Sequence, residues 1–565
     1  MRNLLAPALS ASAILFTGCA STAWRQYGYD SKHFSKQPNE SALTPAAVGT
    51  LHVNFDFVIP AGAAGGGSTH SFSASPSVYN DVAYVGGLNG IFYAIWGTGA
   101  SKGAIKWQYP PATAGGPDAC GVTTQPLLIA PPTNPGSNPS GPGIASSAAI
   151  VTDVPGHANA VIFGAPDPTS NGGDGRVWAL DAETGQCIWK SAVIAPISGT
   201  AKIGYSSPAI AHGRAYIGVS ARVPDAPITV GHLFAVNLTD GTLDPAFKSS
   251  GSTAGFAATD GLAGGGIWSS PAITPSGNVV VTTGNSCHDS NPGCMVEPVV
   301  NYSLSLLKID YSNANVLWQV QPVPFNIDED PDWAAPPTVG QVSCGSLAIS
   351  VQKDGYVYAA DIKTGGPFSN PACSSAGHSL ECPRWTFPHI ATLPFTGGVH
   401  NDTPRFLRMA ALDGDRLYIV AGGPAVSESV PGHPASPATN RLYSLNVCAA
   451  DADRVRWILD VPGGGGCCGA VGAPSTANGV IYITHESGHL FAYADTTVLP
   501  PATFVCSYPG LPSGLSCSGA NFQNIGVPTQ LKDVPITGSV PGVPAISNGQ
   551  VYVATTAGHV IGMVP

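Results

Sequence analysis

Short runs of alternating apolar and polar residues recur along the chain, each opened by a turn and closed by a glycine. A typical run is Asn-Asp-Val-Ala-Tyr-Val-Gly at residues 80–86. Because period-two alternation is typical of half-buried strands, each run predicts a strand of an antiparallel sheet. Clear copies begin near His212, Asp415, Asn478 and Asn548, and degenerate copies lie around Val161, Val280 and Leu347. Eight repeat units are therefore expected.

A second pattern follows several of these units. Its complete version, Ala-Leu-Asp-Ala-Glu-Thr-Gly-Gln-Cys-Ile-Trp, occupies residues 179–189. The Asp and Thr-Gly favour a tight hairpin turn, and we expect the tryptophan to pack between neighbouring sheets. Trp107, Trp318 and Trp457 stand in similar places.

These patterns predict an all-β, eight-bladed β-propeller with tryptophan-docking repeats. Four-stranded sheets that cannot bury both faces alone cover one another when they are arranged radially. One domain is expected over residues 19–565, and the strand-like residues 51–57 are expected to complete the last blade.

Composition supports a folded chain that does not bind nucleic acid. Apolar residues make up 44% of the 565 positions and charged residues only 10%, while 69 glycines and 52 prolines imply many turns. The net charge of −11 and the lack of basic runs exclude a phosphate-binding surface.

The first 18 residues are typical of a secretory signal peptide, with Arg2 ahead of a short apolar stretch. Phe-Thr-Gly-Cys at residues 16–19 resembles a bacterial lipobox, which predicts a lipid anchor on Cys19. Ordinary cleavage is the alternative, because Phe16 replaces the usual leucine. The protein is expected to be exported, and to be periplasmic or anchored to the outer membrane.

The cysteine count agrees with an oxidising compartment, because setting Cys19 aside from the 13 cysteines leaves an even number. Cys120 and Cys187 could form a longer bridge. Cys467 and Cys468 could form a vicinal ring or pair separately with Cys344 and Cys448. Three further pairs would each staple a short loop: Cys287 with Cys294, Cys373 with Cys382, and Cys506 with Cys517. No CxxCH haem-attachment motif is present.

Together these features resemble the pyrroloquinoline-quinone (PQQ) dehydrogenase superfamily over nearly the whole mature chain. The opening Trp-Arg-Gln-Tyr-Gly-Tyr-Asp at residues 24–30 is similar to the start of that family. Gly-Ile-Trp-Ser-Ser-Pro-Ala at 266–272 and Asp-Pro-Asp-Trp-Ala-Ala-Pro at 330–336 look most like the polyvinyl-alcohol dehydrogenases, here without a haem c domain.

The resemblance assigns roles to five residues. It implies that Trp268 is the floor under the quinone and that Ser220 and Lys353 contact the cofactor. Asn285 matches a calcium-ligating amide. Asp332 matches the carboxylate that serves as general base, and it is also assigned to the metal site. Lys353 is the second residue that the resemblance assigns to catalysis.

The implied activity is oxidation of a secondary or polymeric alcohol, with electrons passed to a separate carrier. PQQ and Ca²⁺ would be the cofactors. A carboxylate would take the hydroxyl proton while hydride passes to the quinone, which the calcium ion polarises.

Two departures weaken the enzymatic interpretation. Val223 stands where the family has a calcium-binding glutamate, and Cys120-Gly121 stands where many relatives have a vicinal cysteine pair. A cofactor-free scaffold lipoprotein that binds envelope proteins is therefore the alternative hypothesis.

Structural interpretations also exist for the individual residues. Trp268 could pack between blades, and Lys353 could belong to a polar β-turn. The acidic residues around Asp332, namely Asp328, Glu329 and Asp330, could form a solvated loop. His485 and His489 fall in a strand and hairpin, where i,i+4 spacing does not align two zinc ligands.

Overall fold

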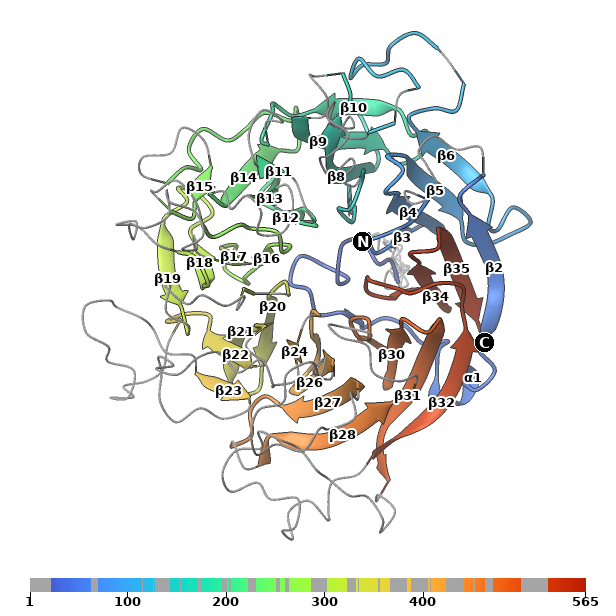
Figure 1. Cartoon of the computed structure of the whole chain (residues 1–565), viewed down its shortest axis with the longest axis vertical. Helices are drawn as coiled ribbons and strands as arrows, with labels where there is room; N and C mark the ends of the chain where they lie inside the picture. Colours follow the sequence, from blue (N-terminus) through green and yellow to red (C-terminus); the bar gives the residue numbers. More distant parts are fainter. Residues whose placement is uncertain are drawn as a thin grey trace, which may run out of the picture.

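Eight antiparallel sheets are arranged in a ring around a central axis (Figure 1), as the repeats predict. The computed structural model describes residues 22–61, 70–113, 115–124, 126–127, 143–152, 154–169, 174–195, 201–202, 205–221, 230–249, 255–259, 264–285, 302–322, 332–333, 335–353, 356–365, 384–387, 405–406, 408–422, 440–450, 453–462, 471–498 and 527–565. Among them, the only helix is α1 (Pro45–Val48). No helix in these ranges is long and apolar enough to cross a membrane.

Each blade has four consecutive positions, from an inner strand at the axis to an outer strand at the rim. Blade one consists of β3 (Ser77–Tyr79), β4 (Val82–Gly86), β5 (Phe92–Trp96) and β6 (Ile105–Tyr109), and blade two of β7 (Ala149–Val151), β8 (Ala160–Asp167), β9 (Asp174–Asp181) and β10 (Cys187–Lys190). Blade three consists of β12 (Ala209–Ala211), β13 (Arg214–Ala221), β14 (His232–Asn237) and β15 (Phe256–Ala257), with β11 (Ala201–Lys202) beside β13. Blade four consists of β16 (Ala272–Ile273), β17 (Val279–Thr282), β18 (Leu306–Ile309) and β19 (Val316–Val320).

Blade five consists of β20 (Thr338–Val342), β21 (Gly345–Val351), β22 (Val357–Asp361) and β23 (Trp385–Phe387), and blade six of β25 (Ala411–Asp413), β26 (Arg416–Gly422), β27 (Asn440–Asn446) and β28 (Val455–Val461), with β24 (Arg405–Phe406) beside β26. Blade seven consists of β29 (Ser475–Ala477), β30 (Val480–His485), β31 (His489–Val498) and β32 (Val527–Pro535), with β1 (Lys36–Gln37) beside β29. Blade eight consists of β33 (Ala545–Ser547), β34 (Gln550–Ala554), β35 (His559–Val564) and β2 (His52–Val58).

The last blade combines both ends of the chain. β2 pairs antiparallel with β35, which places His52 opposite Val564 and Val58 opposite His559. This confirms the prediction that residues 51–57 complete the last blade. Joining the two ends in one sheet closes the ring, because β2 belongs to blade eight and leads along the chain into blade one.

Tryptophans on the outer strands of blades one, two, four and six connect each of these blades to the next. Indole Nε1 of Trp107 donates to the Ala182 carbonyl of blade two, and Trp189 donates in the same way to Leu238 of blade three, each at 3.0 Å. Trp318 repeats the contact with Ile362 at 3.1 Å, whereas Trp457 donates to the Asp495 carboxylate at 3.2 Å. The docking expected from the Asp…Thr-Gly…Trp spacing is confirmed.

Serines fasten neighbouring blades near the axis. Two residues before the inner strand, Ser75, Ser147, Ser207 and Ser270 occupy the same position in blades one to four. The Ser75 backbone N–H donates to Ser147 Oγ at 2.8 Å, and the next two pairs repeat the contact at 3.0 and 2.9 Å. Val543 N donates to Ser75 Oγ and extends this chain of hydrogen bonds to blade eight.

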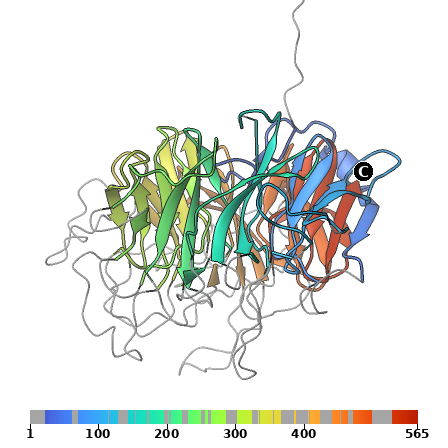
Figure 2. The ribbon, with the colours of Figure 1, turned by 90° about the horizontal axis from the view of Figure 1, so that it is seen from above.

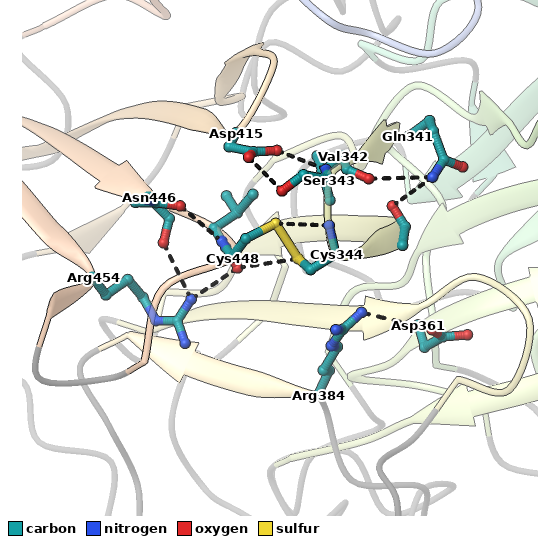
Figure 3. Close-up of a disulfide and its surroundings, with 12 residues drawn as sticks. Gln341, Val342, Ser343, Cys344, Asp361, Arg384, Asp415, Asn446, Cys448 and Arg454 are labelled. Carbon is teal, nitrogen blue, oxygen red and sulfur yellow. Dashed lines mark hydrogen bonds and ion pairs between the residues drawn. A yellow bond between two sulfur atoms is a disulfide. The ribbon is translucent and has the colours of Figure 1, made fainter.

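Two disulfides add covalent links. Cys120 pairs with Cys187, as predicted, and Cys344 pairs with Cys448 (Figure 3). The second bond excludes the alternative in which Cys467 and Cys468 pair separately with Cys344 and Cys448. It forms because two turns of adjacent blades, five and six, lie side by side. Cys467, Cys468 and the three short-loop pairs lie outside the described residues.

Candidate functional site

The strand ends of blades three, four and five bring the predicted site residues to one mouth of the ring. Trp268 precedes β16, Asn285 follows β17, Asp332 precedes β20 and Lys353 follows β21, while Ser220 lies near the end of β13. Inner strands begin at this mouth and second strands return to it. We call it the site mouth.

Backbone hydrogen bonds bind the Trp268 segment to its neighbours. Ile267 N donates to the Val219 carbonyl, next to Ser220, at 3.1 Å. On its other side, Gly284 N donates to the Gly266 carbonyl at 2.8 Å. Trp268 therefore lies between the ends of β13 and β17.

Gly284 permits a close approach by the indole of Trp268. A Cβ atom built at Gly284 would lie 3.3 Å from Trp268 Nε1, so the indole edge passes directly over this glycine. Asn285, the next residue, is 5% exposed and its carbonyl accepts from Gly265 N at 2.9 Å. The structure thus brings Trp268 and Asn285 together, and Trp268 remains partly exposed.

Asp332 and Lys353 form a buried ion pair. Lys353 Nζ lies 2.6 Å from Asp332 Oδ1, and the two side chains are 17% and 2% exposed. The Lys353 backbone N–H also donates to the Asp332 carbonyl at 3.1 Å. Lys353 therefore contacts Asp332 through both its side chain and its backbone. An isolated polar β-turn would not make these contacts with a residue 21 positions away.

Hydroxyl groups connect these two pairs. Ser269, beside Trp268, shares a 2.6 Å hydrogen bond with Thr282, whose hydroxyl donates to the Ala335 carbonyl at 3.1 Å. Ser350 Oγ donates to the same carbonyl at 2.9 Å. Because Ala335 and Ser350 each stand three residues from a member of the ion pair, blades four and five are held in a fixed relationship at the site mouth.

Two further residues, Tyr27 and Arg408, were not anticipated from the sequence. Burial raises the pKa of Tyr27 to about 12, which the nearby Arg408 opposes, and desolvation lowers the pKa of Arg408. Both residues are partly exposed, and Tyr27 packs against a buried apolar cluster. Arg408 stands three residues before its inner strand, where Ser146, Ser206 and Ser269 stand in other blades. An arginine at a repeat position where other blades have serine was the sequence signal that could have indicated this residue.

The two histidines considered as zinc ligands have other partners. His485 ends β30 directly opposite His489 in β31, as the repeat predicts. His485 contacts Ser487 and Asn440, and His489 contacts Asp533. Within the described ranges, no group of three His, Cys, Asp or Glu side chains could hold a metal ion. Val223 and the acidic residues 328–330 lie outside those ranges.

Solved structures with the same architecture are found among quinoprotein dehydrogenases. The quinohemoprotein alcohol dehydrogenase of Comamonas testosteroni is 16% identical with a TM-score of 0.60, covering 97% of this chain and 81% of that one. A quinohemoprotein alcohol dehydrogenase from Pseudomonas putida HK5 is 15% identical with a TM-score of 0.58, covering 96% and 80%. A europium-containing methanol dehydrogenase is 13% identical with a TM-score of 0.60, covering 96% and 98%.

This chain has the eight-bladed propeller fold of the quinoprotein dehydrogenases. The likeness concerns the fold, since no family model and no curated protein sequence matches the chain. Whether the chain shares their chemistry depends on the residues at the site mouth.

Proposed function

We propose that the protein is a PQQ-dependent oxidoreductase that oxidises secondary or polymeric alcohols and passes electrons to a separate carrier. The observation that supports this most directly is the convergence of Trp268, Asn285, Asp332 and Lys353 at one mouth of the ring. An aromatic platform at the same mouth as a carboxylate and a cation matches a flat quinone that carries carboxylate groups.

The donor set fits the quinone better than it fits a calcium ion. Trp268 offers a partly exposed indole, Ser220 a hydroxyl and Lys353 an ammonium group. Asn285 and Asp332 would hold calcium through their oxygen atoms, but calcium takes about six to eight such ligands. Lys353 also occupies Asp332 Oδ1, so a calcium ion would have to use Oδ2 or displace the ammonium.

In this proposal Asp332 receives the proton of the substrate hydroxyl. Lys353 directs the carboxylate, because its side chain and its backbone N–H both contact Asp332. Trp268 would hold the quinone by stacking through its indole ring. When bound, the quinone would supply the acceptor for the hydride that leaves the carbinol carbon.

We also propose that the protein is exported and anchored to a membrane by a lipid on Cys19. The disulfides Cys120–Cys187 and Cys344–Cys448 support an oxidising compartment. The lipobox-like residues 16–19 support the anchor.

Calorimetric titration of the purified protein with PQQ, in calcium or in EGTA, tests the proposal. We expect saturable binding that Trp268→Ala weakens at least about tenfold through lost stacking. Trp96→Ala, on an outer part of blade one, is the matched control and should bind as the wild type does. If PQQ binds, the PQQ-loaded protein would then be assayed for alcohol oxidation with an artificial electron acceptor.

Absence of binding by a folded protein in both buffers would reject the quinoprotein proposal. That result would favour the scaffold hypothesis, in which the propeller binds envelope proteins. The Lys353–Asp332 pair would then be a structural ion pair. Dependence on calcium would assign the metal, and equal binding in EGTA would remove it from the proposal.

A further inference from the structure

The N-terminal residues 22–37, which we call the axial strap, run inside the ring and contact the inner strand of every blade. Trp24 pairs with Val78 of blade one, and Arg25 O accepts from Ile150 N of blade two at 2.8 Å. Ser31 contacts blades three and four, and the strap continues in order through blades five to eight. The contacted residues are Val78, Ile150, Ile210, Ile273, Val339, Leu412, Thr476 and Ile546.

All eight contacts fall at the same height along the axis. In blades one to four, each contacted residue stands three positions after the serine described above (Ser75, Ser147, Ser207 or Ser270). In blades five to eight, the contacted residue occupies the equivalent position of the repeat. The strap then meets its own beginning, because Gln37 Nε2 donates to the Thr22 carbonyl at 2.5 Å. The strap is thus a nearly level loop inside the ring, visible as the blue trace at the centre of Figure 1.

The chain leaves this loop on the side away from the site mouth. Lys36 forms an ion pair with Asp413, at the turn between β25 and β26. Glu40 Oε2 accepts from Gly549 N, in the turn between β33 and β34, at 2.9 Å. These turns join first to second strands and lie opposite the site mouth; we call that side of the ring the turn face.

Chain length decides through which mouth Cys19 emerges. Thr22 stands three positions after Cys19, and three residue steps can span at most about 11 Å. Ile546, at the level of Thr22, stands two residues from Asn548 on the turn face, a rise of about 7 Å in a strand. Ile273, at the same level, stands five residues after Trp268, a rise of about 16 Å. Cys19 can therefore reach the turn face but not the outside of the site mouth.

We infer that the turn face lies against the lipid bilayer and that the site mouth points away from it. This inference rests on the lipid anchor of the proposed function. The large hydrophobic side chains exposed within the described ranges are Val53, Val58, Tyr205 and Leu317, and none lies in a turn between first and second strands. The acyl chains, and not an apolar patch, would provide the affinity for the membrane. Substrate and electron carrier would approach from the aqueous side.

Fluorescence quenching on vesicles tests this orientation. The full-length lipidated protein, carrying a small fluorophore on an unnatural amino acid, would be placed in phosphatidylethanolamine and phosphatidylglycerol vesicles with a head-group quencher. Ser101 is exposed in the turn between β5 and β6, which lies on the turn face because third strands run in the same direction as first strands. Tyr205, which precedes β12, is exposed at the site mouth. We expect most of the fluorescence to be lost at position 101 and little at position 205.

Two controls separate the inference from its premise. Intact mass and the Cys19→Ala variant test lipidation. If Cys19 is unmodified, the proposed lipid anchor is rejected. If the protein is lipidated but quenching is equal at both positions or reversed, only the inferred orientation is overturned. A ten-residue Gly/Ser insertion between Cys19 and Thr22 should leave vesicle binding intact and abolish the difference between the two positions. Persistence of the difference would show that the short tether does not set the orientation.

Discussion

Lys353 Nζ lies 2.6 Å from Asp332 Oδ1 in a part of blade five where the carboxylate is almost fully buried. Two residues that are 21 positions apart in the chain are thereby held together at the site mouth. In such surroundings the loss of one partner leaves a charge that water solvates poorly, so the pair must be kept or removed as a unit.

Lys353→Met should lower the free energy of unfolding by about 3 kcal/mol, because it leaves the Asp332 carboxylate buried without its cation. The double variant Asp332→Asn/Lys353→Met should cost less than the sum of the two single changes. Lys106→Met is the control, because its partner Glu183 is 81% exposed, and it should cost less than about 1 kcal/mol. Chemical denaturation measures all four variants, and additive costs would contradict a coupled pair.

Gly241→Ala should destabilise the protein by more than backbone strain alone. Its φ is +73°, and a Cβ atom would lie 2.6 Å from Trp189 Cε3, so the tryptophan would have to leave its docking position. Gly213→Ala is a matched control, with φ of +69° and nothing within 4 Å of the new atom. We expect about 1 kcal/mol for Gly213→Ala and at least twice that for Gly241→Ala, measured by thermal or chemical unfolding. Equal losses would mean that this docking contact is not tightly packed.

His33 should make stability depend on pH. Its ring lies buried in the strap, Nδ1 donates to the Pro337 carbonyl at 3.0 Å, and burial lowers its pKa to about 4. Between pH 4 and pH 6.5 the unfolded chain therefore binds more protons at this residue than the folded protein does. Its contribution to stability is complete above pH 6.5 and is lost as the pH falls toward 4, by at most about 3 kcal/mol.

His33→Asn should flatten the stability profile between pH 4 and 6.5, because asparagine can donate to the same carbonyl without titrating. Denaturation midpoints at a series of pH values would measure this. His52→Asn, at an exposed position of β2, should keep the wild-type slope. An unchanged slope in His33→Asn would show that the strap histidine is not neutral in the folded state.

The Cys344–Cys448 disulfide should contribute up to about 4 kcal/mol of stability, because it closes a loop of 104 residues in the unfolded chain. Cys344→Ser and Cys344→Ser/Cys448→Ser should be destabilised to a similar extent in unfolding experiments. Neighbouring contacts would still hold blades five and six together: Ser343 hydrogen-bonds to Asp415 (Figure 3), and the Arg454 guanidinium lies 4.2 Å from the ring centre of Trp385. A single variant that keeps wild-type stability would show that the contacts alone fasten these blades.

Local patterns were sufficient to predict the propeller, the docking tryptophans and the strand that closes the last blade. The Asp181 turn illustrates why: its carboxylate accepts from the backbone N–H groups of Glu183 and Thr184, an interaction that needs only neighbouring residues. Alternating strands and such turns have the same geometry in every blade, so eight repeats already specify a ring.

The site depended on contacts between residues far apart in the chain. The sequence alone suggested Trp268, Asn285, Asp332 and Lys353 through a family resemblance, but the ion pair and the indole over Gly284 became apparent only in the folded blades. The proximity of Tyr27 to Arg408, the Cys344–Cys448 pairing and the level course of the strap likewise became apparent only in the folded protein. Spacing within a repeat determines the blade, whereas contacts at the ends of strands, between neighbouring blades and with the strap depend on how the closed ring packs these parts together, and only the tertiary structure decides that.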